Sequence, residues 1–430
     1  MRVVYDISIL SHGYRAQLAR TGIFRVVDRT ANGLASRADV SLEYSAAESW
    51  ENHYWAHRLL ADGGSVRSER LVPNGPLARG LYRAQDYLYG EGSSHRDSAS
   101  ARSIAKALRR LSGAITSRTP SLPKSAVKGR DIFHSGYHAL PDTTRGVEGL
   151  RRFLTVYDLI PVLMPHLFAE GVAVIIRQIY MTMLNSIGPD DFVLAISEST
   201  KSDLCSYLKI NPSRVFVSPL AASPDLFYPM MDGARIDAVR ERYGLPRGSK
   251  YLLTVNTLEP RKNIEHALRC FAAVLQESKI DDLYFLLVGT RGWDVTSIMA
   301  AISNANIASD RVILAGYVPD EDLAPLYSGA LAFIYPSLYE GLGLPPLEAM
   351  QCGTPVITSN TSSLPEVVGD AGILVSPTDG DALSQAMLDM YQKPELRAGF
   401  ERKSVARAQR FSWNRYTDDV VNAYRAALGA

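Results

Sequence analysis

Two glutamates eight residues apart are the strongest sign of chemistry in this sequence. Glu340 lies in a glycine-rich stretch with Gly341 and Gly343, and Glu348 follows a pair of prolines. A carboxylate can accept two hydrogen bonds from a vicinal diol, so Glu348 suits a ribose and Glu340 a sugar ring. The competing interpretation is an ordinary turn with two solvated glutamates.

The residues around this pair predict a strand, a turn and a helix. The apolar run 330–335 is typical of a buried strand. Gly341 and Gly343 would let the backbone come close to a ligand, because no Cβ stands in the way. Pro345 and Pro346 suit a first helical turn, which needs no N–H for its ladder. An uncapped helix start of this kind favours phosphate through its free N–H groups and the helix dipole.

A second candidate set follows another predicted strand, at 251–255. Arg261 and Lys262 come directly after Pro260, and Asn263 is expected to be the N-cap of a helix. Two cations aimed at one point suit a diphosphate leaving group, which gains negative charge as its bond breaks. A basic turn on the surface is the alternative.

Residues 335–350 resemble the Glu-x7-Glu signature of the retaining glycosyltransferases of family four, also called glycosyl transferases group 1. Further matches follow in the order and spacing of that family, at 254–263, 288–293, 315–318, 352–357 and 363–367. The resemblance is close over roughly residues 190–400, and it covers only short separate segments of the first 190 residues.

The resemblance implies an α/β chain of GT-B fold, in which two Rossmann-like parallel-sheet domains face a central cleft. It implies retaining, metal-independent transfer of a hexosyl unit from a nucleotide diphosphate sugar, with a GDP-sugar slightly favoured. The implied acceptor is a saccharide or a lipid-linked acceptor in surface polysaccharide biosynthesis, and the departing phosphate oxygen takes the acceptor proton. No cofactor and no metal are expected.

The resemblance also assigns site residues. The expected donor-binding residues are Gly22, Asn256, Arg261, Lys262, Glu340, Gly341, Leu342, Gly343 and Glu348. The expected catalytic residues are Glu340, Asp158, Lys262 and Arg261.

Some of these positions depart from the family pattern. Asp158 ends a predicted strand, but Tyr157 stands where relatives frequently have histidine, so the role of an imidazole is not carried over. Asp158 is the expected polar group on the acceptor side, and a helix-capping acid is the alternative. Asn256 stands where the family commonly has glycine, and Phe24 stands where it often has a second glycine after Gly22.

The rest of the chain predicts alternating strands and helices. Apolar strand candidates are 3–7, 153–157, 192–196, 215–218, 251–255, 284–288, 312–314, 332–335, 356–358 and 373–375. Such runs separated by helices indicate parallel sheets covered on both faces. With 430 residues, two domains are expected. We assign 1–228 to an acceptor-side domain, 229–400 to a nucleotide-sugar-binding domain and 401–430 to a helix that crosses back.

Composition excludes several classes of protein. Lys+Arg of 46 against Asp+Glu of 45 gives no signal for nucleic acid. Three cysteines without a Cys-x2-Cys pair argue against a disulfide framework or a zinc site and fit a reducing cytoplasm. The chain enters a predicted strand at once, so no signal peptide is expected, and no run of 18 apolar residues suggests a membrane span.

One segment, about 94–130, is markedly basic, with nine Lys/Arg and one acid. Ile104, Leu108, Leu111 and Ile115 recur there at helical spacing. A basic amphipathic helix can lie on an anionic leaflet, so peripheral contact with the inner membrane or with a lipid-linked acceptor is one hypothesis. A solvated insertion helix is the other.

Weaker motifs favour structural roles. Ser197 and Asp379 are expected to cap helices, Glu366 to lie near the donor or to cap a loop, and His134 with His138 makes a weak metal pair. The first strand lacks a Gly-x-Gly-x-x-Gly, which counts against a dinucleotide enzyme.

Three other functions stay open: a nucleotide-sugar epimerase or hydrolase of GT-B fold, a non-catalytic sugar-nucleotide-binding scaffold, and a glycosidase. A glycosidase needs two carboxyl groups about 5–10 Å apart across a cleft, which the sequence does not indicate.

Overall fold

The computed structural model describes residues 1–16, 22–62, 66, 70–72, 75–89, 120–168, 171–290 and 310–429. The basic segment predicted at about 94–130 lies outside the described residues except for 120–130. The family match at 291–293 lies outside them as well.

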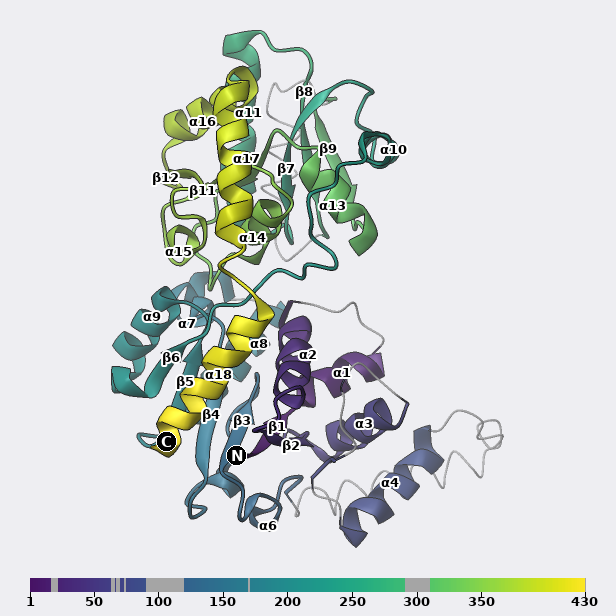
Figure 1. Cartoon of the computed structure of the whole chain (residues 1–430), viewed down its shortest axis with the longest axis vertical. Helices are drawn as coiled ribbons and strands as arrows, with labels where there is room; N and C mark the ends of the chain where they lie inside the picture. The colour runs from purple at the N-terminus through teal and green to yellow at the C-terminus, as the bar shows by residue number, and fades with distance from the viewer. Residues whose placement is uncertain are drawn as a thin grey trace.

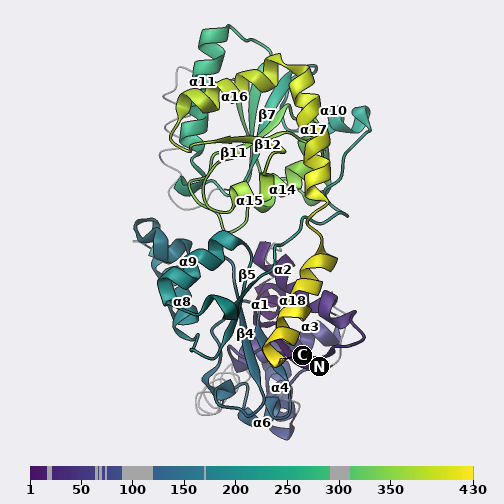
Figure 2. The ribbon, with the colours of Figure 1, turned by 60° about the vertical axis from the view of Figure 1, so that its left-hand side comes forward.

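The N-terminal half is built on a six-stranded parallel sheet of order β2-β1-β3-β4-β5-β6. Its strands are β1 (Arg2–Asp6), β2 (Ser41–Ser45), β3 (Ile132–Ser135), β4 (Arg151–Val156), β5 (Phe192–Ala195) and β6 (Val215–Val217). Most of their residues are buried, because helices cover both faces of the sheet (Figures 1 and 2).

The helices of this half lie between its strands. They are α1 (Ser8–Ala16), α2 (Gly22–Ala35), α3 (Trp50–Ala61), α4 (Pro76–Tyr89), α6 (Lys124–Val127), α7 (Ile160–Leu163), α8 (Gly171–Asn185) and α9 (Glu198–Leu208), with short 3₁₀ turns η1 (Asp142–Thr144), η2 (Pro165–Phe168) and η3 (Pro212–Arg214).

The C-terminal half has a second six-stranded parallel sheet, of order β12-β11-β10-β7-β8-β9. Its strands are β7 (Lys250–Val255), β8 (Leu283–Val288), β9 (Val312–Gly316), β10 (Ala332–Tyr335), β11 (Val356–Ser359) and β12 (Gly372–Val375). The flanking elements are α10 (Gly233–Arg242), η4 (Pro260–Lys262), α11 (Ile264–Ser278), α13 (Asp320–Ser328), α14 (Leu344–Gln351), α15 (Leu364–Val368) and α16 (Gly380–Gln392).

The chain ends in two helices, whereas the sequence analysis predicted one helix over 401–430 that crosses back to the N-terminal domain. α17 (Pro394–Ala408) packs against α14 and α16 and so belongs to the C-terminal sheet. After residues 409–412, α18 (Trp413–Leu428) packs against α2 and β5 of the N-terminal sheet, as Figure 1 shows in yellow. The two halves are therefore connected twice, through 218–232 and through 409–412.

Every strand that the sequence predicts is present, and β2 and β3 were missed. β2 begins and ends in serine and has Glu43 at its centre, and β3 ends in His134 and Ser135, so neither forms an apolar run. His134 is nevertheless fully buried, because Thr155 and Tyr424 both hydrogen-bond its ring.

Cys205, Cys270 and Cys352 are free thiols, as their wide spacing predicts. Among the described residues, no helix has both the length and the apolar character that crossing a membrane requires.

Candidate active site

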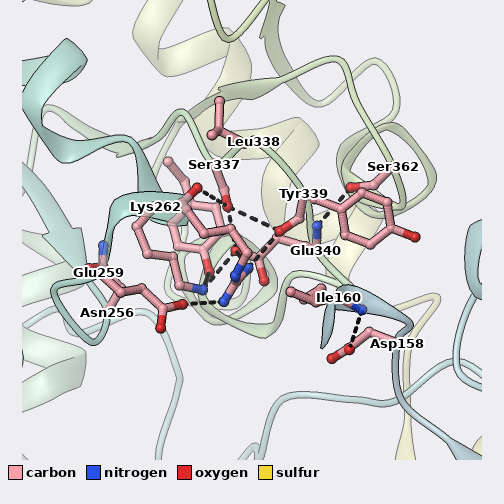
Figure 3. A network of polar contacts seen from close by, with 12 residues as sticks. Asp158, Ile160, Asn256, Glu259, Lys262, Ser337, Leu338, Tyr339, Glu340 and Ser362 are labelled. Carbon is pink, nitrogen blue, oxygen red and sulfur yellow. Dashed lines mark hydrogen bonds and ion pairs between the residues drawn. The ribbon is translucent and has the colours of Figure 1, made fainter. Parts of the chain in front are cut away.

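The predicted catalytic residues meet where the carboxyl ends of strands from the two sheets face each other. Arg261 and Lys262 follow β7, Glu340 follows β10, and Asp158 follows β4 of the other sheet. Ligands of open α/β sheets bind at such strand ends. Figure 3 shows the group from close by.

Glu340 is the centre of a buried ion cluster. Its Oε1 lies 2.7 Å from Nζ of Lys262 and 2.8 Å from a guanidinium nitrogen of Arg261. Glu340 is 8% exposed and Lys262 9%. In so dry a setting the three charges interact far more strongly than they would in water.

Serine side chains fix Glu340 from three sides. The hydroxyl of Ser337 donates to the Glu340 carboxylate at 2.6 Å. The backbone N–H of Glu340 donates to Ser362 at 2.9 Å, and the hydroxyl of Ser363 donates to its backbone carbonyl at 2.9 Å. Burial alone would raise the pKa of Glu340, but Lys262 and Arg261 outweigh burial and lower it to about 2. The carboxylate is therefore ionised at neutral pH.

The two cations are held in place by further contacts. Arg261 donates to the carbonyl of Tyr339 at 2.6 Å and pairs with Glu259, and Lys262 donates to the hydroxyl of Tyr335 at 2.6 Å. Two acids thus balance the two cations, whereas the sequence analysis considered only the cations. The cluster as a whole is close to neutral, so a bound diphosphate would share these cations with Glu259 and Glu340.

Asp158 faces this cluster from the N-terminal half. Its carboxylate accepts from the N–H of Ile160 at 2.9 Å at the start of α7, and the hydroxyl of Tyr180 donates to its carbonyl at 2.7 Å. The contact with Ile160 agrees with the helix-capping alternative. Burial raises the pKa of Asp158, and Glu340 adds to the rise, while the bond from Ile160 and the charge of Arg261 oppose it.

Gly341 lies at a backbone contact between the two halves. A Cβ there would lie 2.1 Å from the carbonyl oxygen of Tyr157. The carbonyl of Gly341 accepts from Ser197 at 2.6 Å. The structure therefore gives a reason for this glycine that differs from the predicted approach of a ligand: the other domain occupies the space.

Gly343 and Leu342 shape the start of α14. Gly343 has φ of +100° and is the N-cap residue, without a side-chain capping bond, as the sequence predicts. A Cβ there would lie 2.7 Å from Leu364. Leu342 is buried in the core and contributes apolar packing.

Glu348 lies apart from the ion cluster, in the second turn of α14. The hydroxyl of Tyr327 donates to its carboxylate at 3.1 Å. Burial raises the pKa of Glu348 to about 7, although the Tyr327 bond and the charge of Arg25 oppose the rise. Arg25 belongs to α2 and pairs with Asp320 at 2.7 Å, so α2 approaches this end of the site.

Gly22 begins α2, and no atom of the described residues lies within 4 Å of the place a Cβ would take. Packing against the described part of the chain does not require glycine at this position. Arg20 and Thr21, which precede it in the family match, lie outside the described residues.

Two asparagines follow β7 at the edge of the site, and Asn263 departs from expectation in its side chain. Asn256 has no positive φ, its Nδ2 donates to Thr254 at 2.8 Å, and its buried Oδ1 has no hydrogen-bond partner among the described residues. Asn263 is the N-cap residue of α11 in a left-handed conformation, with φ of 57°, but its side chain caps nothing. Its Nδ2 donates instead to the carbonyls of Pro336 and Pro377, at 3.1 and 2.8 Å.

The sequence analysis missed several residues of the site: Glu259, Tyr335, Ser337, Ser362, Ser363 and Tyr180. An acid two residues before Arg261 was a usable signal for Glu259. Tyr335, Ser337 and Ser363 lie within the family matches, whereas Ser362 and Tyr180 gave no signal, because chain folding alone brings them to the site.

The weaker motifs have structural roles. Ser197 caps α9 and Asp379 caps α16, as predicted. Glu366 accepts from the N–H groups of Glu198 and Ser199 and so caps α9 across the domain junction.

The predicted histidine pair does not converge. His138 contacts Glu48 at 3.2 Å, whereas His134 bonds Thr155 and Tyr424. In the part of the chain that the structure describes, no three His, Cys, Asp or Glu side chains gather at a point.

Comparison with known proteins agrees with this geometry. Residues 235–407 match the family of glycosyl transferases group 1. The C-terminal domain belongs to that family. The chain is 36% identical over 250 residues to O-antigen chain mannosyltransferase B of Escherichia coli, a match that covers 58% of this chain and 64% of that protein. The match therefore spans somewhat less than two thirds of this relative.

Two solved structures show the fold of the whole chain. Sucrose-phosphate synthase from Thermosynechococcus elongatus superposes with a TM-score of 0.64 at 22% identity, over 99% of this chain and 98% of that one. Anabaena HepE superposes with a TM-score of 0.65 at 14% identity, over 99% of both chains. The two parallel-sheet domains have the GT-B arrangement that the resemblance implies.

Proposed function

We propose that this protein is a glycosyltransferase that moves a hexosyl unit, mannosyl in the first place, from a nucleotide diphosphate sugar to a saccharide or lipid-linked acceptor. The observation that carries the proposal is the buried cluster of Arg261, Lys262 and Glu340, which faces Asp158 where two parallel-sheet domains meet. The relative named O-antigen chain mannosyltransferase B supports mannose and surface polysaccharide. Anabaena HepE was solved in complex with UDP, which supports a nucleotide ligand.

Arg261 and Lys262 would stabilise the diphosphate that leaves. Both are positioned by contacts that do not involve a ligand, to Tyr339 and Tyr335, so little reorganisation is needed as charge develops. Lys262 can turn from Glu340 toward a phosphate oxygen while it keeps its bond to Tyr335. Since two protein cations supply this stabilisation, we propose that no metal ion is required.

We further propose that the anomeric configuration is retained. The bond from the anomeric carbon to the phosphate oxygen breaks, and the acceptor oxygen bonds to the same face of that carbon. The acceptor proton passes to the departing phosphate oxygen. Glu340 would hold hydroxyls of the sugar ring, and Asp158 would bind on the acceptor side.

Glu348 would accept both hydroxyls of the ribose. Its carboxylate already accepts one bond, from Tyr327, and has lone pairs left for a diol. The nucleoside would then lie toward α2 and Arg25, at the other end of α14 from the ion cluster. A GDP-sugar is our first choice of donor.

A thermal-shift panel of GDP-, UDP-, dTDP- and ADP-sugars tests the proposal on the wild type, Glu348→Ala and the control Glu277→Ala. Glu277 is an exposed glutamate of α11, so its loss should change nothing. A ligand at about 100 times its Kd adds roughly 2.7 kcal/mol of stability. We expect one nucleotide class to stabilise the wild type and the control but not Glu348→Ala. No shift with any nucleotide at millimolar concentration would contradict the proposal.

The three free cysteines fit a reducing compartment, so we propose a cytoplasmic site of action. Contact of the basic segment 94–130 with the inner membrane stays a prediction. Co-sedimentation with anionic vesicles at low salt tests it.

A further inference from the structure

A recess at the domain junction, bordered by Leu342 of the turn before α14, is lined by three arginines. Arg407 comes from the last turn of α17, Arg410 from the connection that follows, and Arg415 from the first turn of α18. They surround a cavity of about 270 Å³. Figures 1 and 2 show that this connection carries the chain from the C-terminal domain back to the N-terminal one.

The recess carries an excess of positive charge. Its one acidic lining residue among those described, Glu366, accepts from the N–H groups of Glu198 and Ser199 at 2.8 and 2.7 Å. In the described part of the chain no carboxylate forms an ion pair with the three arginines. Two acids act from a distance: Asp370 on Arg407, although it is paired with Lys403 at 3.5 Å, and Asp419 on Arg415. The acid of the recess is thus already engaged with backbone groups.

Two of the three arginines, Arg407 and Arg415, donate to backbone carbonyls. Nε of Arg407 donates to Val367 at 3.0 Å, and a terminal nitrogen of the same guanidinium donates to the carbonyl of Glu366. A guanidinium nitrogen of Arg415 donates to the carbonyl of Arg410 at 3.4 Å. Burial lowers the pKa of Arg407, and the charge of Arg410 lowers it further, which is the sign of repulsion between the two. An anion would relieve that repulsion.

We propose that this recess is an anion site that binds inorganic phosphate or diphosphate between Arg407, Arg410 and Arg415. A guanidinium offers a planar fork of donors that matches phosphate oxygens, and three of them can engage one phosphate group. The cavity is slightly smaller than the range of about 300–1,000 Å³ typical of drug-sized ligands, which suits a small anion.

Binding would connect the two domains. Arg407 stands on a helix that packs against the C-terminal sheet, and Arg415 stands on a helix that packs against the N-terminal one. Because one anion would contact both helices, it would hold the two domains in the arrangement seen here. The site would therefore oppose separation of the domains.

Calorimetric titration of inorganic phosphate and diphosphate at constant ionic strength, with chloride as the reference anion, tests the proposal. Arg410→Gln and Arg415→Gln should each weaken binding by about tenfold, because each removes a charge-assisted contact. Arg402→Gln is the matched control, since Arg402 is an exposed arginine of α17 that does not line the recess. Lys262→Gln should keep the affinity for inorganic phosphate, because Lys262 does not line the recess.

Hydrogen exchange gives a second measurement on the wild type. Phosphate should slow amide exchange in 407–415 by about tenfold, because a bridged connection opens less often. The proposal is wrong if phosphate binds Arg410→Gln and Arg415→Gln as tightly as the wild type, or if only Lys262→Gln loses it. Unchanged exchange in 407–415 at saturating phosphate would also overturn it.

Discussion

Glu348→Gln should change how stability and nucleotide affinity depend on pH. The folded protein raises the pKa of Glu348 from 4.5 to about 7. Between these values the native state keeps a proton that the unfolded chain releases, so the free energy of unfolding falls as pH rises. The whole shift corresponds to about 3 kcal/mol, and the partial exposure of the side chain reduces our expectation to about 2–3 kcal/mol.

The Glu348→Gln substitution removes the titration but keeps an acceptor for the hydroxyl of Tyr327. Denaturant unfolding of the wild type and Glu348→Gln at steps from pH 4.5 to pH 8 measures the effect. The free energy of unfolding of Glu348→Gln, relative to that of the wild type, should rise by about 2–3 kcal/mol up to pH 7 and then stay constant. Glu277→Gln, an exposed control, should follow the wild type.

Donor affinity should show the opposite trend. A ribose diol donates to an ionised carboxylate, so the nucleotide selects the charged form of Glu348. Wild-type affinity should fall by about tenfold for each pH unit below pH 7, and Glu348→Gln should bind weakly at every pH. Parallel unfolding curves, together with a pH-independent wild-type affinity, would refute the reasoning about Glu348.

Three further predictions follow from the site. Gly341→Ala should disrupt the domain contact, because its Cβ would lie 2.1 Å from the carbonyl oxygen of Tyr157. Its transferase activity should fall at least tenfold. The control Gly399→Ala, on α17, should behave as the wild type in the same assay, because a Cβ there meets no atom of the described residues within 4 Å. Glu366→Ala should lower the melting temperature and leave kcat within about twofold, because its carboxylate caps α9; a large loss of kcat with unchanged stability would be inconsistent with that role. Chelation with EDTA should leave turnover unchanged, and a loss that Mg²⁺ or Mn²⁺ restores would show that Arg261 and Lys262 are insufficient.

The pattern of apolar runs was enough to predict the alternating parallel-sheet architecture and the turn from β10 to α14. The same pattern could not predict β2 and β3, because serines in β2 and His134 with Ser135 in β3 interrupt any apolar run. The partner of His134, Tyr424, is 290 residues away in sequence. No local pattern carries that information.

The candidate site shows the same limit. Local spacing and family resemblance pointed to Arg261, Lys262 and Glu340, which the structure brings together. The contact of Gly341 with Tyr157 was not foreseen, because a glycine required by another domain looks the same in sequence as one required by a ligand. The neutral balance of the cluster was missed since Glu259 was not counted as a partner of Arg261.

The most direct test of the account is product analysis with GDP-mannose and a panel of mannose-containing acceptors, for the wild type and Glu340→Gln. The account predicts that the wild type releases GDP and forms a new glycosidic bond with the anomeric configuration of the donor. Glu340→Gln should lose both by about 10²-fold or more, because the neutral amide no longer pairs with Lys262 and Arg261. Release of GDP without a new glycosidic bond, or equal rates in the two proteins, would contradict it.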